Sequence, residues 1–453
     1  LAPLGIEVTT LLPGYPQVMD RLARARVVHR WPDLFGGPAA VVSAEAAGLA
    51  LLVLDAPRLY VRGGNPYVDA DGKGWPDNAE RFAALAWAAA QVGGGLLDGY
   101  RPDVVHAHDW QAALAPVYLR FHPTRAGKPT TLLTIHNLAF QGLYPANLLS
   151  RLRLPPESFT IDGVEYFGQI GFLKGGLALA DHVTTVSPTY AQEIQGSETG
   201  MGLDGLLRHR SHVLTGILNG IDTDVWNPAT DEHLAARYDK SRIEERRDNK
   251  AAVRRHFGLR DEDPGPLVAV VSRLTSQKGM DLLPAALPRL LAEGGQLALL
   301  GAGDPALESE LAAAAARHPG RIGAVFGYHE GLSHLLQGGA DAILVPSRFE
   351  PCGLTQLIGL RYGAVPLVAR VGGLADTVID ANDAALAAGV ATGFQFTPVT
   401  ADALAVTLAR MAHAYRDQAV WRSLQERGMA ADVGWRRPAR QYADLYKVLI
   451  EVR

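Results

Sequence analysis

The sequence has one cysteine, no long apolar run and little net charge. Because Cys352 is the only cysteine, no disulfide can form within the chain, and the cysteine content does not suggest secretion. No run of about 18 or more apolar residues occurs, so we expect no membrane-spanning helix. The formal net charge of −4 argues against a basic surface for nucleic acid. We therefore expect a cytoplasmic protein that binds neither a membrane nor nucleic acid.

Both halves of the sequence alternate short apolar runs with helical patterns. In the first half, we predict strands at Ile6–Leu12, Leu51–Leu54, Val104–His106, Leu132–Ile135, Val183–Val186 and Val213–Leu218. In the second half, we predict strands at Leu267–Val271, Leu297–Leu300, Ile322–Phe326, Ala342–Val345 and Val365–Ala369. This alternation predicts an α/β protein whose parallel sheets and crossover helices form two doubly wound domains.

The loops that follow the predicted strands are the places to search for a site, because doubly wound sheets bind ligands beyond the carboxyl ends of their strands. Arg273 and Lys278 follow one strand of the second half, and Gly372 and Gly373 follow another. Two cations can neutralise a diphosphate, and glycines at a helix start let backbone amides approach a phosphate. Solvated loop cations and a tight turn are the alternative interpretations.

Glu350 is a carboxylate in the otherwise apolar and glycine-bearing loop after the predicted strand at 342–345. Glycosyl transfer passes through a centre that resembles an oxocarbenium ion, which a nearby carboxylate can stabilise. The alternative is an acid placed at the start of the predicted helix Leu354–Tyr362. Cys352, in the same loop, has the pattern of a packed and unreactive thiol.

Polar side chains also lie at the carboxyl ends of two predicted strands of the first half. His106 is the last residue of one strand and is followed by His108 and Asp109, and His136 and Asn137 follow the next strand. A metal site is one interpretation of this set. Directional hydrogen bonds to sugar hydroxyls are a better one, because neutral imidazole, carboxylate and amide groups all form them.

Two further patterns are weak. Asp-x-Asp triplets occur at 69–71, 222–224 and 261–263, and we interpret the first and third as surface turns rather than metal sites. The stretch Gly301–Asp304 lacks the third glycine of a dinucleotide fingerprint, so it also predicts a turn. A dinucleotide-dependent oxidoreductase is therefore not expected.

The loop at 347–356, Ser-Arg-Phe-Glu-Pro-Cys-Gly-Leu-Thr-Gln, resembles the signature loop of bacterial glycogen synthases and plant starch synthases. Other motifs that resemble this family follow in order through the chain: His-Ala-His-Asp-Trp at 106–110, Thr-Ile-His-Asn at 134–137, Phe-Leu-Lys-Gly-Gly at 172–176, Asn-Gly-Ile-Asp at 219–222, Ser-Arg-Leu-Thr-Ser-Gln-Lys-Gly at 272–279, Gly-Tyr-His-Glu at 327–330 and Gly-Gly-Leu-Ala-Asp-Thr-Val at 372–378.

The resemblance implies a GT-B fold, in which two Rossmann-like domains face a deep cleft. The domains would be residues 1–218 and 219–437, with 438–453 crossing back to the first. It also implies a retaining α-1,4-glucosyltransferase that uses ADP-glucose as a substrate. The acceptor would be glycogen or a malto-oligosaccharide, and neither a metal nor a cofactor would be needed. Oligomeric state is not implied.

The resemblance also implies roles for particular residues, matched by motif. The catalytic set would be Glu350, Arg273, Lys278, His136 and Asp109. The donor would be bound by Arg273, Lys278, Tyr328, Thr355, Gly372, Gly373, Asn137, Asn219 and Cys352. Arg273 and Lys278 would hold the diphosphate, and Tyr328 would lie against the adenine. No residue stands out as a nucleophilic carboxylate, which favours a front-face attack by the acceptor.

One departure from the family pattern concerns the start of the sequence. The family begins with a strand and a Lys-x-Gly-Gly-Leu loop, which this sequence does not contain, and we expect that they belong to a longer gene product. Two alternatives stay open, namely another GT-B glycosyltransferase and a non-catalytic glucan-binding homologue. Other GT-B enzymes carry a second glutamate eight residues after the first, where this sequence has Ile358.

Overall fold

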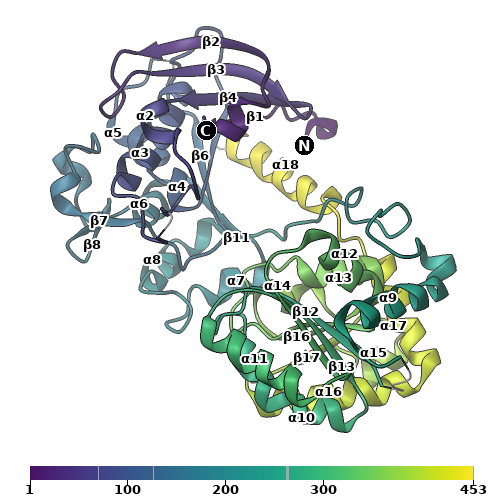
Figure 1. The fold of residues 1–453 in the computed structure, drawn as a ribbon. Coiled ribbons are helices and arrows are strands. Elements are labelled where there is room, and N and C mark those ends of the chain that lie inside the picture. The colour runs from purple at the N-terminus through teal and green to yellow at the C-terminus, as the bar shows by residue number, and fades with distance from the viewer. Residues whose placement is uncertain (70, 126, 262–264, 452–453) are drawn as a thin grey trace. The chain divides into compact units, whose positions relative to one another are not determined.

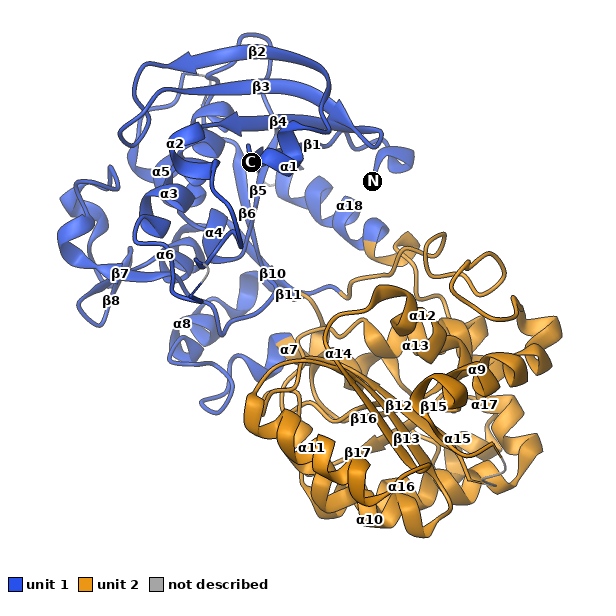
Figure 2. Ribbon diagram, in the orientation of Figure 1, with its two compact units in different colours: residues 1–185, 191–217, 439–453 blue, residues 186–190, 218–438 orange. Residues whose placement is uncertain are grey.

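The computed structural model describes residues 1–69, 71–125, 127–261 and 265–451. The chain divides into two compact units (Figure 2). The first contains residues 1–185, 191–217 and the segment from Ala439 onward, and the second contains residues 186–190 and 218–438. The short segment 186–190 joins the second unit because the Ser187 Oγ donates to the Pro351 carbonyl at 2.7 Å and the Thr189 Oγ1 donates to Asp376 Oδ1 at 2.7 Å.

The second unit is built on a six-stranded parallel sheet in the order β14-β13-β12-β15-β16-β17. Of these strands, β12, β13, β16 and β17 are labelled in Figure 1. Its strands are β12 (Leu267–Val271), β13 (Gln296–Gly301), β14 (Ile322–Phe326), β15 (Ala342–Val345), β16 (Val365–Ala369) and β17 (Phe394–Phe396). Its helices are α9 (Arg246–Phe257), α10 (Leu283–Ala292), α11 (Pro305–Arg317), α12 (Glu330–Gly339), α13 (Thr355–Tyr362), α14 (Gly372–Thr377), α15 (Asp383–Ala387), α16 (Ala401–Arg416) and α17 (Gln418–Ala430). Short 3-10 helices cover Lys240–Glu245 and Met280–Leu282.

Both faces of this sheet are buried, because successive side chains of each strand point to opposite faces. Val268 and Val270 of β12 pack in one cluster with side chains of α10, α11, α16 and α17. Leu267 and Ala269 of the same strand pack in another cluster with side chains of α9, α12 and α14. Helices on both faces hold the sheet rigid, so the loops at its edge start from fixed points.

The first unit holds two separate four-stranded sheets in the described residues. One is mixed, in the order β1-β4-β3-β2, and the other is parallel, in the order β11-β10-β6-β5. The strands of these sheets are β1 (Thr9–Pro13), β2 (Ala23–Trp31), β3 (Ala39–Ala46), β4 (Leu49–Asp55), β5 (Val104–His108), β6 (Thr130–Ile135), β10 (His182–Thr185) and β11 (Leu214–Gly216). A small antiparallel sheet contains β7 (Leu143–Pro145), β8 (Glu165–Tyr166) and β9 (Gln169–Gly171).

The helices of the first unit are mostly short. They are α1 (Pro16–Met19), α2 (Pro57–Tyr60), α3 (Asn78–Gly93), α4 (Asp109–Ala112), α5 (Leu114–Phe121), α6 (Phe172–Leu179) and α8 (Asp204–His209). Short 3-10 helices cover Ala2–Leu4, Ala146–Leu148, Pro156–Ser158 and Ser211–Val213. α7 (Pro188–Glu193) and α18 (Arg436–Glu451) each begin in the second unit and end in the first. None of the helices in the described residues is both long and apolar enough to cross a membrane.

The predicted strands of the second half fit the structure closely, and those of the first half fit less well. β12, β14, β15 and β16 have the predicted bounds, whereas β17 was not predicted. β1 begins at Thr9 rather than Ile6, and the antiparallel strands β2 and β3 were not predicted at all. β2 is exposed over most of its length and carries three arginines, and β3 is rich in alanine, so neither is a continuous run of large apolar residues.

Candidate active site

Two loops of the second unit emerge side by side from its parallel sheet. β12 pairs with β15, with Val268 opposite Ala342, so the loops that follow these strands leave the same edge. The loop after β12 carries Arg273 and Lys278, and the loop after β15 carries Glu350. The topology thus brings together residues that are 72 positions apart in the sequence.

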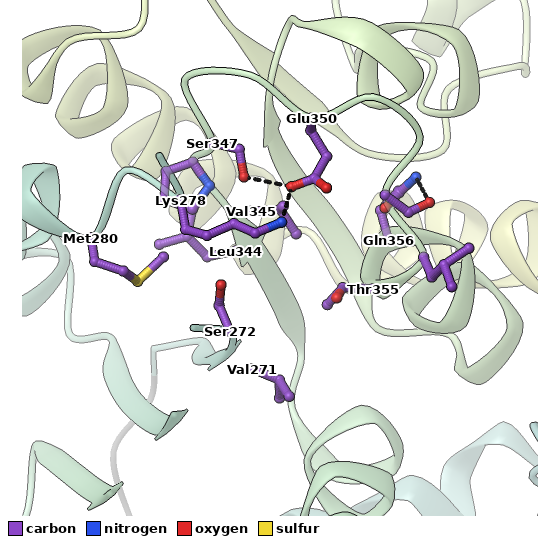
Figure 3. Close-up of a pocket in the computed structure, with 13 residues that line it drawn as sticks. Val271, Ser272, Lys278, Met280, Leu344, Val345, Ser347, Glu350, Thr355 and Gln356 are labelled. Carbon is purple, nitrogen blue, oxygen red and sulfur yellow. Dashed lines mark hydrogen bonds and ion pairs between the residues drawn. The ribbon is translucent and has the colours of Figure 1, made fainter. Parts of the chain in front are cut away.

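Glu350 and Lys278 form an ion pair at this edge. The Lys278 Nζ lies 2.5 Å from Glu350 Oε2, and the Ser347 hydroxyl donates to the same oxygen at 2.8 Å (Figure 3). The side chains of Lys278 and Glu350 are only 18% and 10% exposed. Glu350 Oε1 accepts no hydrogen bond from any residue that the structure describes. The carboxylate is therefore held through one oxygen, and its other oxygen is available to a ligand.

These three side chains line a cavity of about 90 Å³. Its wall is formed by the ends of β12 and β15, the loop at 346–354 and the start of α13, through Val271, Ser272, Lys278, Met280, Leu344, Val345, Pro346, Ser347, Glu350, Gly353, Leu354, Thr355 and Gln356. Thr355 is the first residue of α13, and no side chain caps this helix. The amides at a helix start carry partial positive charge, so this wall suits an anion.

The two glycines at the start of α14 lie directly against the Glu350 loop. A Cβ added to Gly372, whose φ is +42°, would lie 2.1 Å from the Glu350 carbonyl oxygen, and one added to Gly373 would lie 2.1 Å from that of Cys352. The Gly373 amide donates to the Glu350 carbonyl at 3.1 Å. The glycines therefore let the two loops meet, a structural role beyond the predicted contact with phosphate.

The remaining predicted donor residues of the second unit differ in exposure. Arg273 is exposed, and its side chain has no partner within the part of the chain that is described. Tyr328 is 89% exposed. Cys352 is buried, and burial raises the pKa of its thiol to about 11, although the Asn219 backbone amide hydrogen-bonds the sulfur. Arg273 and Tyr328 are thus free to meet a ligand, while Cys352 is a packed, protonated thiol.

In the first unit, Asp109 is held by the backbone of the neighbouring strand end. Its Oδ1 accepts hydrogen bonds from the amide of His136 at 2.7 Å and from that of Asn137 at 3.4 Å. Burial raises the pKa of Asp109, against the lowering effect of these bonds and of the His136 side chain. Asp109 also has a φ of +53°, which is uncommon for a residue with a side chain. The three predicted residues of this unit are therefore in direct contact.

A row of imidazoles leads from His136 to the C-terminal helix. His136 Nε2 lies 3.0 Å from His108 Nδ1, and the His108 ring stacks on His106 at 4.2 Å. His106 Nδ1 lies 2.7 Å from the Tyr446 hydroxyl of α18, and its Nε2 lies 2.6 Å from Thr134 Oγ1. Desolvation and the adjacent imidazoles lower the pKa of His108 to about 4 and that of His106 well below its usual value. His106 and His108 are therefore neutral near pH 7.

Metal-ligating side chains do not gather in the described residues, where no group of three or more is placed to hold an ion. Asp69 Oδ1 accepts from the amides of Asp71 and Lys73, and Asp222 Oδ1 accepts from those of Asp224 and Val225. These two triplets are therefore local turns. The third triplet, at 261–263, extends beyond the described residues.

Three residues of the site edge carry roles that the sequence analysis did not assign. Ser347 binds Glu350, and Arg348 forms a bidentate ion pair with Asp281 at 2.6 and 2.7 Å. Ser347 stands three residues before Glu350 in the loop, which is the one signal in the sequence that could have shown it. Nothing in the sequence pairs Arg348 with Asp281, because they lie 67 positions apart on different loops.

Comparison with known families gives two matches along the chain. Residues 1–209 match the starch synthase catalytic domain, and residues 254–423 match glycosyl transferases group 1. The glycogen synthase of Rhodopseudomonas palustris (strain BisA53) is 60% identical over 453 residues, which are 100% of this chain and 92% of that protein. Glycogen synthase 1 of Rhizobium meliloti (strain 1021) is 54% identical over 451 residues, 99% of this chain and 93% of that protein.

Solved structures agree with these matches. The catalytic domain of starch synthase IV from Arabidopsis thaliana, bound to ADP and acarbose, superposes with a TM-score of 0.85 and 32% identity, covering 97% of this chain and 92% of that one. Sucrose-phosphate synthase from Thermosynechococcus elongatus is similar in fold alone, with a TM-score of 0.55 and 20% identity over 91% of this chain and 86% of that one.

Proposed function

The chain belongs to the glycogen synthase family, and on this premise we propose that it transfers glucose from ADP-glucose to the non-reducing end of an α-1,4-glucan with retention of configuration, releasing ADP. It is a glucosyltransferase with the GT-B fold. ADP-glucose is then a substrate rather than a cofactor. The acceptor is glycogen or a malto-oligosaccharide, and the reaction takes place in the cytoplasm without a metal ion.

The arrangement of Lys278, Ser347 and Glu350 is the observation that carries the proposal. A nucleotide diphosphate sugar presents two kinds of group to a protein, namely anionic phosphates and neutral sugar hydroxyls. Lys278 supplies a cation at the cavity, and Glu350 has one oxygen free to accept a bond from a hydroxyl. A cation and a carboxylate fixed this closely can contact the phosphate and the sugar of one donor molecule.

The diphosphate is the group whose charge changes most during transfer. As the bond from the anomeric carbon to the phosphate oxygen breaks, negative charge grows on the leaving ADP. Arg273 and Lys278 stabilise this charge, and the open start of α13 at Thr355 adds its amide dipoles. Gly372 and Gly373 complete the phosphate side, and Tyr328 lies against the adenine. Cys352, in the loop that carries Glu350, packs against Gly373.

The acceptor attacks from the face that the diphosphate leaves. The acceptor hydroxyl gives its proton to a phosphate oxygen of the departing ADP, and its oxygen forms the new bond to the anomeric carbon. Configuration is retained, because the bond that forms lies on the same face as the bond that breaks. Glu350 stabilises the positive charge on the sugar and needs to form no covalent bond to it.

The residues of the first unit bind the sugar in this proposal. Asp109, His136 and Asn137 form one hydrogen-bonded group, and the neutral imidazoles beside it offer directional contacts without a net charge. We assign Asn219 to sugar recognition as well. This division assigns the cations to the donor phosphates, and the carboxylate, imidazole and amide groups to glucose.

The test is release of ADP by the full-length gene product with ADP-glucose and glycogen. Parallel reactions contain UDP-glucose in place of ADP-glucose, or no glycogen. We expect ADP release from ADP-glucose that depends on glycogen, and slower release of UDP from UDP-glucose. Binding of glycogen without any ADP release would instead support a non-catalytic glucan-binding homologue.

A further inference from the structure

Besides the ion pair between Lys278 and Glu350, one further residue, Arg348, joins the two loops that carry them. The Arg348 guanidinium donates to both carboxylate oxygens of Asp281, at 2.6 and 2.7 Å, and to the Ser276 carbonyl at 2.8 Å. The Arg348 amide donates to the Gln277 carbonyl at 2.9 Å. Arg348 thus makes four hydrogen bonds to one segment of the neighbouring loop.

These bonds bracket Lys278 along the chain. Ser276 and Gln277 come directly before Lys278, and Asp281 comes three residues after it. Arg348 itself stands two residues before Glu350. A displacement of either loop would therefore change the distance between the Lys278 ammonium and the Glu350 carboxylate only by breaking bonds to Arg348.

The backbones of the two loops also touch beside this side chain. Gly279 has a φ of +69°, and a Cβ added there would lie 1.9 Å from the Pro346 carbonyl oxygen. Close approach of this kind sets a minimum separation between the loops, while the bonds from Arg348 set a maximum. Together they fix the position of Lys278 in the direction of Glu350.

We propose that Arg348, through Asp281, is a positioning residue that sets the separation of Lys278 from Glu350 for catalysis. Its guanidinium is already committed to a bidentate pair, in contrast to Arg273, so it acts on the substrate through Lys278 rather than by contact. The inference rests on the proposed glucosyl transfer. Its energetic reason is that a shift of about 1 Å at a reacting group can cost up to about 100-fold in rate.

A structural role alone would have a different signature. The side chains of Arg348 and Asp281 are 38% and 36% exposed, and ion pairs at such exposure contribute little to stability. The pair of Arg422 with Glu426 on α17 is a matched control, with exposures of 38% and 40% and a contact of 2.7 Å. Loss of either arginine should lower the melting temperature by a similar small amount.

The experiment compares Arg348→Ala with Arg422→Ala, and then repeats Arg348→Ala in a Lys278→Ala background. We expect Arg348→Ala to lower kcat/KM for ADP-glucose by about 10-fold, with Arg422→Ala within about 2-fold of the parent. Arg348→Lys should recover only part of the loss, because an ammonium cannot form the bidentate pair. In the Lys278→Ala background, Arg348→Ala should add little, because residues that act through one another are not additive.

Additive effects of Arg348→Ala and Lys278→Ala, or equal kinetics of the Arg348→Ala and Arg422→Ala variants, would overturn the proposal. Amide hydrogen exchange over residues 272–281 provides a measurement that needs no turnover. If this segment exchanges faster in the Arg348→Ala variant but not in the Arg422→Ala variant, Arg348 holds the two loops together. Equal exchange in the two variants would overturn the proposal. If the parent protein is inactive but shows this exchange difference, the proposed function is contradicted, whereas the contact of Arg348 with the neighbouring loop is not.

Discussion

The side chains that follow the parallel strands differ in chemistry between the two units. In the second unit, the strand ends carry charges that are paired with one another, as in Lys278 with Glu350 and Arg348 with Asp281. In the first unit, the strand ends carry neutral imidazoles, and the one acid, Asp109, is bound by backbone amides. The same kind of sheet edge therefore supports an ionic site in one unit and a largely neutral site in the other.

This difference indicates which interactions hold the side chains of each site in position. Ion pairs that join different loops hold the second site, so a change of one charge there should disturb its partner. Backbone amides of adjacent strands hold the first site, and their positions are fixed by the sheet itself. We expect substitutions to affect activity most strongly in the second unit, less strongly at Asp109, and least strongly at the histidines behind it.

The largest effect is expected at Glu350. Glu350→Gln keeps the shape of the side chain but removes the charge that faces the sugar, and we expect kcat to fall by about 10² to 10³-fold. The measurement is ADP release with saturating ADP-glucose and glycogen.

A control is needed because Lys278 would lose its partner when Glu350 is neutralised. Ser347→Ala removes the other bond to Glu350 Oε2 without a change of charge, and it should cost less than Glu350→Gln. Activity of Glu350→Gln close to that of the parent would remove Glu350 from the catalytic set.

An intermediate effect is expected at Asp109. Asn is the suitable substitution, because it tolerates the positive φ of this position and can still accept a bond from the His136 amide. The neutral acceptor forms a weaker bond than the carboxylate, so we expect kcat/KM to fall by about 10-fold. Steady-state kinetics measures this loss, and circular dichroism checks that the fold is kept. Unchanged kcat/KM in Asp109→Asn would mean that the charge of Asp109 is not used.

The smallest effect is expected on the pH dependence of stability. The folded protein lowers the pKa of His108 from its usual value of 6.5 to about 4, and it lowers the pKa of His106 well below that usual value. Below about pH 6.5 the unfolded chain therefore binds protons that the folded chain does not, and stability falls as the pH falls toward 4.

The variant that tests this pH dependence is His106→Asn with His108→Asn. Between pH 7 and pH 5, the melting temperature of this double variant should fall less than that of the parent, measured in matched buffers. Replacement of the exposed His318 is the control, and it should leave the slope of the parent unchanged. Equal slopes for the parent and the double variant would show that these rings do not resist protonation.

The sequence predicted the second unit better than the first for a physical reason. Strands that are buried on both faces are nearly continuous apolar runs, as in Leu267–Val271 and Val365–Ala369, and such runs are visible without any partner. Strands such as Ala23–Trp31 are exposed on much of their surface and are held by antiparallel pairing with a neighbour. That pairing depends on residues elsewhere in the chain, so the local pattern does not report it.

The sequence by itself determined the kinds of group that are available to the reaction. The motifs around Lys278, Glu350, Asp109 and His136 specify a cation, two carboxylates and an imidazole, each in a segment that follows a strand. Only the tertiary structure decided which of these groups are paired and which are free. The pairing of β12 with β15 brings Lys278 to Glu350 and Arg348 to Asp281, and it leaves Arg273 unpaired among the described residues. Distances of this kind arise from the register of parallel strands and the close approach of their loops, which no local stretch of sequence encodes.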